Sequence, residues 1–153
     1  MYTRQEASLI RKNFWTRFGQ YMRPVQGAEG DTINWLNYKT GIRHIYFRMD
    51  AGKESASIAI ELSHPDTIAQ EYYFEQLQNL KTIFQESVGE EWDWQLLIPD
   101  ENGNPVSRIE KKLEGVNIFK EEDWPAIISF LKPRIIALDN FWIMVKDSFE
   151  AGI

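Results

Sequence analysis

The stretch that decides the fold is residues 33–64, INWLNYKTGIRHIYFRMDAGKESASIAIELSH, in which apolar and polar residues alternate. A β-strand turns successive side chains to opposite faces, so this alternation indicates strands with one buried face. Two turn-forming stretches interrupt the pattern, at Thr40-Gly41 and at residues 50–53. The stretch therefore predicts a three-stranded antiparallel meander, with strands at residues 33–39, 42–50 and 55–63.

Alternation also assigns the faces of the meander. Four apolar residues of the second and third strands are expected to lie beneath helices, namely Ile45, Phe47, Ile58 and Ile60. Matching these apolar faces allows only pairings whose residue numbers add up to an odd value. A four-residue loop would place His44 opposite Glu61, and a two-residue loop would shift each partner by two. Under either register Glu61, His44 and Arg48 share the other face.

The segment before the meander predicts a helix. Thr3 and Glu6 form a T-x-x-E capping box, in which each side chain accepts a hydrogen bond from the other residue's backbone amide. Apolar residues then follow at helical spacing, at Ala7, Ile10, Phe14, Phe18 and Tyr21. Pro24 ends the helix, and residues 25–32 are expected to form a loop.

The segment after the meander predicts a second helix. Ser63 or His64 is expected to cap it, Pro65 is tolerated in its first turn, and Gly89 ends it. The apolar stripe that supports this helix consists of Tyr73, Leu77, Leu80, Phe84 and Val88.

A hairpin and a last helix complete the chain. Residues 92–98 alternate strictly, and residues 106–113 return as a more charged strand that is expected at an edge of the sheet. The helix that begins near Glu121 contains Pro133, which predicts either a kink or two helices that meet there. The order of elements is helix, three strands, helix, two strands, and a long or kinked helix. Residues 1–153 are thus expected to form a single α+β domain, an antiparallel sheet with helices packed on one face.

Composition restricts the function classes. The chain of 153 residues has no Cys and only two His, which argues against disulfides, thiol nucleophiles and a zinc site. Its net charge of -6 argues against nucleic acid, because such binders neutralise phosphates with clustered Lys and Arg. No signal-peptide pattern and no apolar window long enough for a membrane span is present, so a cytoplasmic protein is expected. No cofactor or metal is predicted.

The polar face of the meander is the candidate site. It collects Trp35, His44, Tyr46, Arg48, Asp50 and Glu61. As a binding site, Arg48 would hold a carboxylate or phosphate between the rings of Trp35 and Tyr46, with Glu61 or His44 as an acid or base. As structure alone, the charged residues would form a cross-strand ion network. Both interpretations remain open at this point.

A metal-dependent nuclease is the catalytic alternative. Asp50 at the end of one strand and Glu61 inside the next resemble the acidic pair of restriction-endonuclease-like folds, whose carboxylates hold Mg²⁺. Such sites carry a Lys two residues after the second acid, where this chain has Ser63, so Lys53 would have to replace it from a turn. This departure and the acidic charge place the nuclease second.

Several runs resemble the bacterial family known as domain of unknown function 4268. They include RKNFW at residues 11–15, NWLNYKTGIRHIYFRMD at 34–50, ASIAIELSH at 56–64 and EWDWQ at 91–95. The resemblance implies no catalytic residue, although some members lie beside nuclease-like regions in longer proteins. We therefore expect a non-enzymatic binding module that uses Arg48 to anchor a protein partner or a small acidic ligand.

Overall fold

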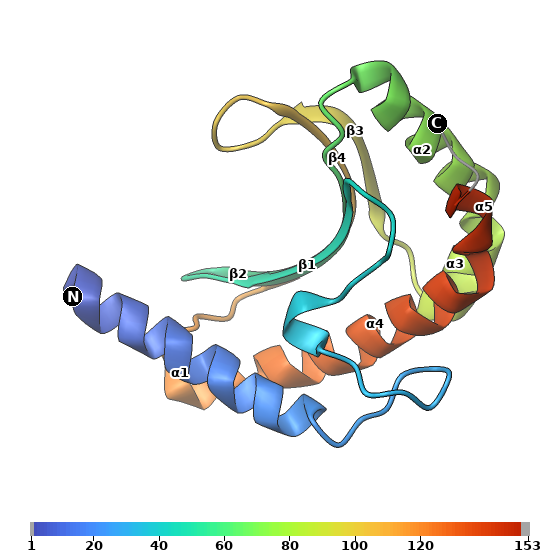
Figure 1. Ribbon diagram of the computed structural model, residues 1–153. Helices are drawn as coiled ribbons and strands as arrows, with labels where there is room; N and C mark the ends of the chain where they lie inside the picture. The colour runs from blue at the N-terminus through green and yellow to red at the C-terminus, as the bar shows by residue number, and fades with distance from the viewer. Residues whose placement is uncertain (1, 151–153) are drawn as a thin grey trace.

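The computed structural model describes residues 2–150 and combines helices with an antiparallel sheet (Figure 1). The helices are α1 (Arg4–Met22), α2 (Thr67–Asn79), α3 (Lys81–Val88), α4 (Trp124–Val145) and α5 (Asp147–Glu150), with 3-10 turns at Trp35–Asn37 and Glu121–Asp123. The strands are β1 (Ile45–Ala51), β2 (Ser55–Leu62), β3 (Asp93–Pro99) and β4 (Pro105–Glu114). The predicted α+β class is confirmed.

The four strands form one antiparallel sheet in the order β1-β2-β4-β3. The sheet is strongly curved, and α1, α4 and the α2–α3 pair lie on its convex side (Figure 1). The four residues expected beneath the helices are buried there: Ile45, Phe47, Ile58 and Ile60. Within residues 2–150 no helix covers the concave side, so one face of the sheet is open (Figure 1).

The hairpin β1–β2 follows one of the two predicted registers. Arg48 pairs with Ala59 and Tyr46 pairs with Glu61, as a two-residue loop requires. The backbone amide of Gly52 donates to Ser55 O at 2.8 Å, which closes this turn around residues 53 and 54. The register places the side chains of Tyr46, Arg48 and Glu61 on the open face.

The first predicted strand, residues 33–39, is wrong. This segment contains the 3-10 turn Trp35–Asn37, and the side chain of Asn34 accepts a hydrogen bond from the amide of Asn37 at 3.3 Å. Trp35 is buried, and its Nε1 donates to Val25 O at 2.9 Å. The alternation therefore reflects side-chain burial without strand pairing, because an Asn side chain that bonds nearby backbone competes with a ladder.

The predicted edge position of the second hairpin's return strand is also wrong. That strand is β4, which lies between β2 and β3. Its charged residues Arg108, Glu110 and Lys112 pair with Glu61, Ala59 and Ser57, so they lie on the open face. An open sheet face and a sheet edge both place alternating charges in water, so this sequence pattern does not distinguish them.

Strand β3 does not keep the strict alternation that its sequence predicts. Its pairing with β4 shifts between Gln95 and Ile98, where Leu97 has a φ of 51°. Leu96 is consequently 45% exposed rather than buried. The amide of Leu97 donates to Ser107 Oγ at 2.9 Å, so a β4 hydroxyl satisfies a backbone group that the bulge releases.

A buried polar link joins this bulge to the helical layer. Gln70 on α2 and Ser107 on β4 are both fully buried. Ser107 Oγ donates to Gln70 Oε1 at 2.7 Å, and Gln70 Nε2 donates to His64 O and Pro105 O at 3.0 and 3.1 Å. Every polar atom of the two side chains is thus paired, as burial demands.

The helices differ from their predictions mainly at their ends. The capping box of Thr3 and Glu6 is present at α1. The second predicted helix is divided at Leu80 into α2 and α3, and its cap is Asp66, whose side chain accepts from the amide of Ile68. Helix α4 runs through Pro133 without a break. Between residues 2 and 150 none of the helices has the length and apolarity needed to cross a membrane.

Candidate functional site: the open face of the sheet

The open face presents rows of side chains drawn from neighbouring strands. The first row consists of Tyr46, Glu61, Arg108 and Gln95, and the second of Arg48, Ala59, Glu110 and Asp93. A third row runs from Asp50 through Ser57 to Lys112. Small residues on β2 are thus flanked by long charged residues on β1 and β4.

This arrangement leaves a hollow of about 660 Å³ on the open face, called here the sheet hollow. Ser55, Ser57 and Ala59 form its floor, because their side chains are too short to fill the curve of the sheet. The β3–β4 loop contributes Pro99, Asp100 and Glu101 to the lining. Figure 1 shows this loop reaching over the concave side.

Two arginines share one carboxylate on the open face, and we call Arg48, Glu61 and Arg108 the Glu61 cluster. Arg48 Nε donates to Glu61 Oε2 at 3.1 Å, and Arg108 Nε donates to Glu61 Oε1 at 3.0 Å. The Arg48 guanidinium also lies over the ring of Tyr46, 4.2 Å from its centroid. Each guanidinium contributes only its Nε. Within residues 2–150 the terminal nitrogens of both make no hydrogen bond.

Exposure increases from the carboxylate outward. The Glu61 side chain is 14% exposed, that of Arg108 is 26% exposed and that of Arg48 is 56% exposed. The carboxylate therefore holds the two Nε groups from below, while the terminal nitrogens of the more exposed Arg48 reach solvent. Taken alone, the cluster carries a net charge of +1.

The rest of the hollow is acidic. Three basic and five acidic side chains line it in all, and the acids outside the Glu61 cluster are Asp50, Asp100, Glu101 and Glu110. Lys112 is the basic lining residue outside the cluster. A ligand in this hollow thus meets positive charge at the cluster and negative charge around it.

The predicted site residues do not all gather here. Tyr46, Arg48 and Glu61 are brought together, as described above. Asp50 lies on the same face, but it pairs with Ser57, and its Oδ1 accepts from the amide of Ala51 at 2.9 Å. Trp35 is buried on the helical side.

His44 lies just outside the sheet. It precedes β1 with a φ of 70°, in the left-handed region, and its ring centroid is 4.6 Å from that of His64. Burial lowers the pKa of His44, and the nearby positive charges of His64 and Arg43 lower it further. His44 therefore lies beside a second histidine and apart from the Glu61 cluster.

The acidic pair of the nuclease alternative does not converge. Asp50 pairs with Ser57, two rows from Glu61, and both oxygens of Glu61 accept hydrogen bonds from arginines. Among residues 2–150 there is no group of three or more His, Asp or Glu side chains placed to hold a metal ion. These positions do not favour a metal-dependent reaction at Asp50 and Glu61.

Sequence reasoning missed Arg108, which supplies half of the donors in the Glu61 cluster. Its position depends on the pairing of β2 with β4, which joins segments on either side of α2 and α3. The available signal was the alternation of Arg108, Glu110 and Lys112, whose side chains lie on one face of a strand.

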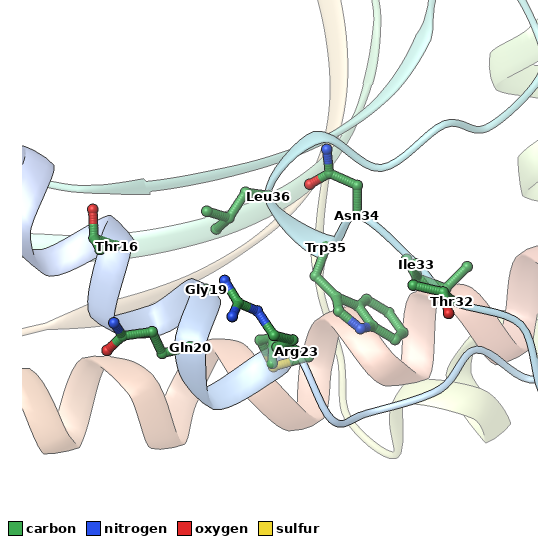
Figure 2. Close-up of a pocket in the computed structure, with 10 residues that line it drawn as sticks. Thr16, Gly19, Gln20, Arg23, Thr32, Ile33, Asn34, Trp35 and Leu36 are labelled. Atoms are coloured by element: carbon green, nitrogen blue, oxygen red, sulfur yellow. The ribbon is translucent and has the colours of Figure 1, made fainter.

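A second hollow of about 440 Å³ lies between α1 and residues 32–36. Figure 2 shows Trp35 and Leu36 against Gly19, Gln20 and Arg23 of α1. It contains no carboxylate or histidine, and Trp35 Nε1 is already paired with Val25 O. It offers apolar contact and one guanidinium, without a group suited to acid or base chemistry.

A buried carboxylate in the helical layer is also fully used. Asp139 on α4 accepts hydrogen bonds from the Tyr38 hydroxyl and from the amide of Ala28, the latter at 2.8 Å. Burial, together with the bond to Asp139 and its charge, raises the pKa of Tyr38. The pair fastens residues 25–38 to α4 and leaves no free acid or base.

The model for the family described as "Domain of unknown function (DUF4268)" matches residues 10–146. The chain belongs to this family. The match extends from α1 to the end of α4, so the DUF4268 region includes the whole sheet and the Glu61 cluster. No curated protein and no solved structure matches the chain. The DUF4268 description assigns no activity.

Proposed function

We propose that this protein is a non-enzymatic binding module whose open sheet face takes an acidic group at the Glu61 cluster. One observation supports this assignment: two guanidiniums are held on a single carboxylate through Nε alone, beside a hollow of about 660 Å³. Their terminal nitrogens remain available as donors. A carboxylate or phosphate accepts such donors strongly, because charge-assisted hydrogen bonds are about twice as strong as neutral ones.

Glu61 acts in this proposal as a positioning group. By accepting one hydrogen bond on each oxygen it fixes both guanidinium planes before a ligand arrives, which reduces the entropy lost on binding. Tyr46 supports Arg48 from the other side through its ring face. Both oxygens of Glu61 are already engaged by arginines, which supports a positioning role for this carboxylate over direct contact with a substrate.

The test is a titration of ¹⁵N-labelled protein with inorganic phosphate and, separately, with succinate, following the arginine Nε–Hε signals by NMR. We expect the signals of Arg48 and Arg108 to move together and to saturate. Arg48→Met should weaken the affinity by about tenfold or more, since a hydrogen bond to a charged group is lost.

Arg4→Met is the matched control, because Arg4 is an exposed arginine on α1, and this helix lies on the convex side of the sheet (Figure 1). It should leave both titrations unchanged. If the signals of Arg4 respond as strongly as those of Arg48, the anions bind arginines without preference and the proposed function is wrong. Equal affinity of the parent and Arg48→Met for both anions leads to the same conclusion.

A further inference from the structure

Besides its open face, the sheet has an outer edge along β1, on the side of this strand that faces away from β2. Ser63 N donates to His44 O, and Gly52 N donates to Ser55 O, so the even-numbered residues between them direct their backbone groups toward β2. The odd-numbered residues of β1 therefore direct theirs outward, away from the sheet. They are Ile45, Phe47, Met49 and Ala51.

Both ends of this edge are closed by local hydrogen bonds. At one end, Ile45 N donates to Ile42 O at 3.2 Å, and Thr40 Oγ1 donates to Ile45 O at 2.7 Å. At the other, Ala51 N donates to Asp50 Oδ1 at 2.9 Å, and Arg11 Nη1 donates to Ala51 O at 3.2 Å.

Among the described residues, the middle of the edge has no such hydrogen bonds. Within residues 2–150, the backbone N–H and C=O of Phe47 and Met49 have no hydrogen-bond partner, and we call these four groups the edge window. An unpaired row of strand donors and acceptors is a template for another strand, and capping both ends limits the length that can pair. The window matches three residues of an added strand.

The side chains next to the edge window differ on its two faces. On the helical side, Trp15, Leu36 and Met49 line a hollow of about 330 Å³. On the open side, between Phe47 and Met49, stands Arg48, whose terminal nitrogens are free of protein hydrogen bonds within the described residues. An added strand would therefore meet an apolar hollow with one face and a guanidinium with the other.

We propose that the edge window accepts an extended peptide segment as an added strand, with an acidic residue between two apolar ones. The acidic side chain lies opposite Arg48, and an apolar neighbour enters the hollow of Trp15, Leu36 and Met49. Relative to the added strand, Arg48 occupies a non-hydrogen-bonded position, because its backbone groups point toward β2. Side chains of paired strands approach most closely at such positions. This inference rests on the proposed function, since it identifies the carrier of the acidic group that Arg48 binds.

A second copy of the chain fits this edge less well. Self-pairing that satisfies all four groups of the edge window must place Phe47 of each copy opposite Met49 of the other. That register sets Arg48 directly opposite Arg48 of the second copy, and like charges in directly opposed positions destabilise a ladder. The charge at the centre of the edge window thus selects an acidic segment over a second β1.

The test uses a synthetic peptide, acetyl-Thr-Leu-Glu-Leu-Thr-amide, titrated to millimolar concentration into ¹⁵N-labelled protein. We expect the amide signals of Phe47 and Met49 to shift downfield and their hydrogen exchange to slow. A peptide with Gln in place of Glu, and Arg48→Met with the parent peptide, should each bind about tenfold more weakly. N-methylation of both leucines should abolish binding, because it removes the backbone donors.

Leu36→Ala should weaken peptide binding, while Leu9→Ala, at a similarly exposed leucine of α1, should not.

If the peptide moves the Nε–Hε signals of Arg48 and Arg108 but leaves the Phe47 and Met49 amides unchanged, the edge inference is wrong and the proposed function stands. If the peptide, phosphate and succinate all leave the Arg48 and Arg108 signals and the Phe47 and Met49 amides unchanged, the edge inference and the proposed function are both wrong. Slow exchange at Phe47 and Met49 in a dimer detected by ultracentrifugation would assign the edge to a second copy and overturn the peptide assignment.

Discussion

The Glu61 cluster and the contact between Arg134 and Glu90 use the same chemical groups differently. In the helical layer, Arg134 donates from Nε and Nη2 to the two oxygens of Glu90 at 2.8 and 2.9 Å, and from Nη1 to Phe130 O at 2.9 Å. Glu90 Oε2 also accepts from Trp92 Nε1. On the open face, Arg48 and Arg108 each give only Nε to Glu61.

This difference separates a structural arginine from one with binding capacity. All three nitrogens of Arg134 are occupied within the protein, so its guanidinium connects α4 to the segment before β3 and has little left for a ligand. The two arginines at Glu61 are oriented but not saturated. Under the proposed function, the ligand-binding cluster is the one whose guanidinium nitrogens are only partly used by the protein, so the number of nitrogens in use matters more than the presence of an ion pair.

The largest effect should come from the packed side of β2. Ile60→Ala removes a fully buried side chain beneath the helices and should lower the free energy of unfolding by about 2–5 kcal/mol. Ser57→Ala, on the open face of the same strand, should change it by less than about 0.5 kcal/mol. Urea denaturation of both variants measures this contrast, and equal midpoints would remove the distinction between the two faces.

The next effect should come from Arg134→Met. It leaves the half-buried Glu90 carboxylate without its main partner and should lower the free energy of unfolding by about 1–3 kcal/mol. Arg134→Lys should recover only part of the loss, since an ammonium cannot supply the same fork of donors. Thermal unfolding at neutral pH tests both variants. A loss below about 0.5 kcal/mol for Arg134→Met would contradict the structural role.

The contact between Arg134 and Glu90 also predicts that the stability of the fold depends on pH in the acid range. Burial alone would raise the pKa of Glu90, but hydrogen bonds from Arg134 and Trp92 and the charge of Arg134 outweigh burial, so the folded pKa lies below the ordinary 4.5. The stabilisation is therefore complete above the unfolded pKa and is lost as pH falls through the folded pKa. Stability measured from pH 6 to pH 3 should fall less steeply in Arg134→Met than in the parent.

Arg48→Met should have a small effect on folding and a large effect on binding. The Arg48–Glu61 pair is more than half exposed at the arginine, so its loss should cost about 0–1 kcal/mol. Affinity for the acidic probes should nevertheless fall as described above. Chemical denaturation together with the anion titration separates the two effects. A large loss of stability without a loss of affinity would make this cluster structural, like that of Glu90.

The smallest effect concerns His44. Because burial and neighbouring positive charges lower its folded pKa, the unfolded state takes up a proton first, and stability falls as pH drops below about 6.5. His44→Asn removes this dependence and keeps a residue type that tolerates the left-handed backbone. Melting temperatures from pH 7.5 to 5.5 should therefore decline less in the variant. An identical decline would assign the titration to other groups.

The sequence predicted the packed side of the molecule better than the open side. Alternation around Ile45, Phe47, Ile58 and Ile60 identified two strands and their buried face, because each strand must cover its apolar residues locally. The same logic failed at residues 33–39, where Trp35 is buried by a 3-10 turn that packs against α1. Periodicity reports which side chains are buried, whereas a strand also needs its backbone free to pair, and here the Asn34 side chain bonds the amide of Asn37 in a 3-10 turn instead.

The candidate site was predicted only in part for a related reason. Tyr46, Arg48 and Glu61 lie on adjacent strands of one hairpin, so their proximity follows from local register. Arg108 reaches Glu61 only through the pairing of β2 with β4, which no short-range pattern specifies. Asp50 shares the face but not the cluster, because alternation assigns a face and not a row.

The order of strands in the sheet has a consequence for how the chain folds. The hairpins β1–β2 and β3–β4 each pair segments close in sequence, whereas β2–β4 pairs Leu62 with Ser107 across α2 and α3. Closing that long loop costs chain entropy before any contact compensates, so joining the hairpins is expected to limit the folding rate. Substitutions along the β2–β4 seam should then slow folding, while those at the β1 edge should mainly speed unfolding.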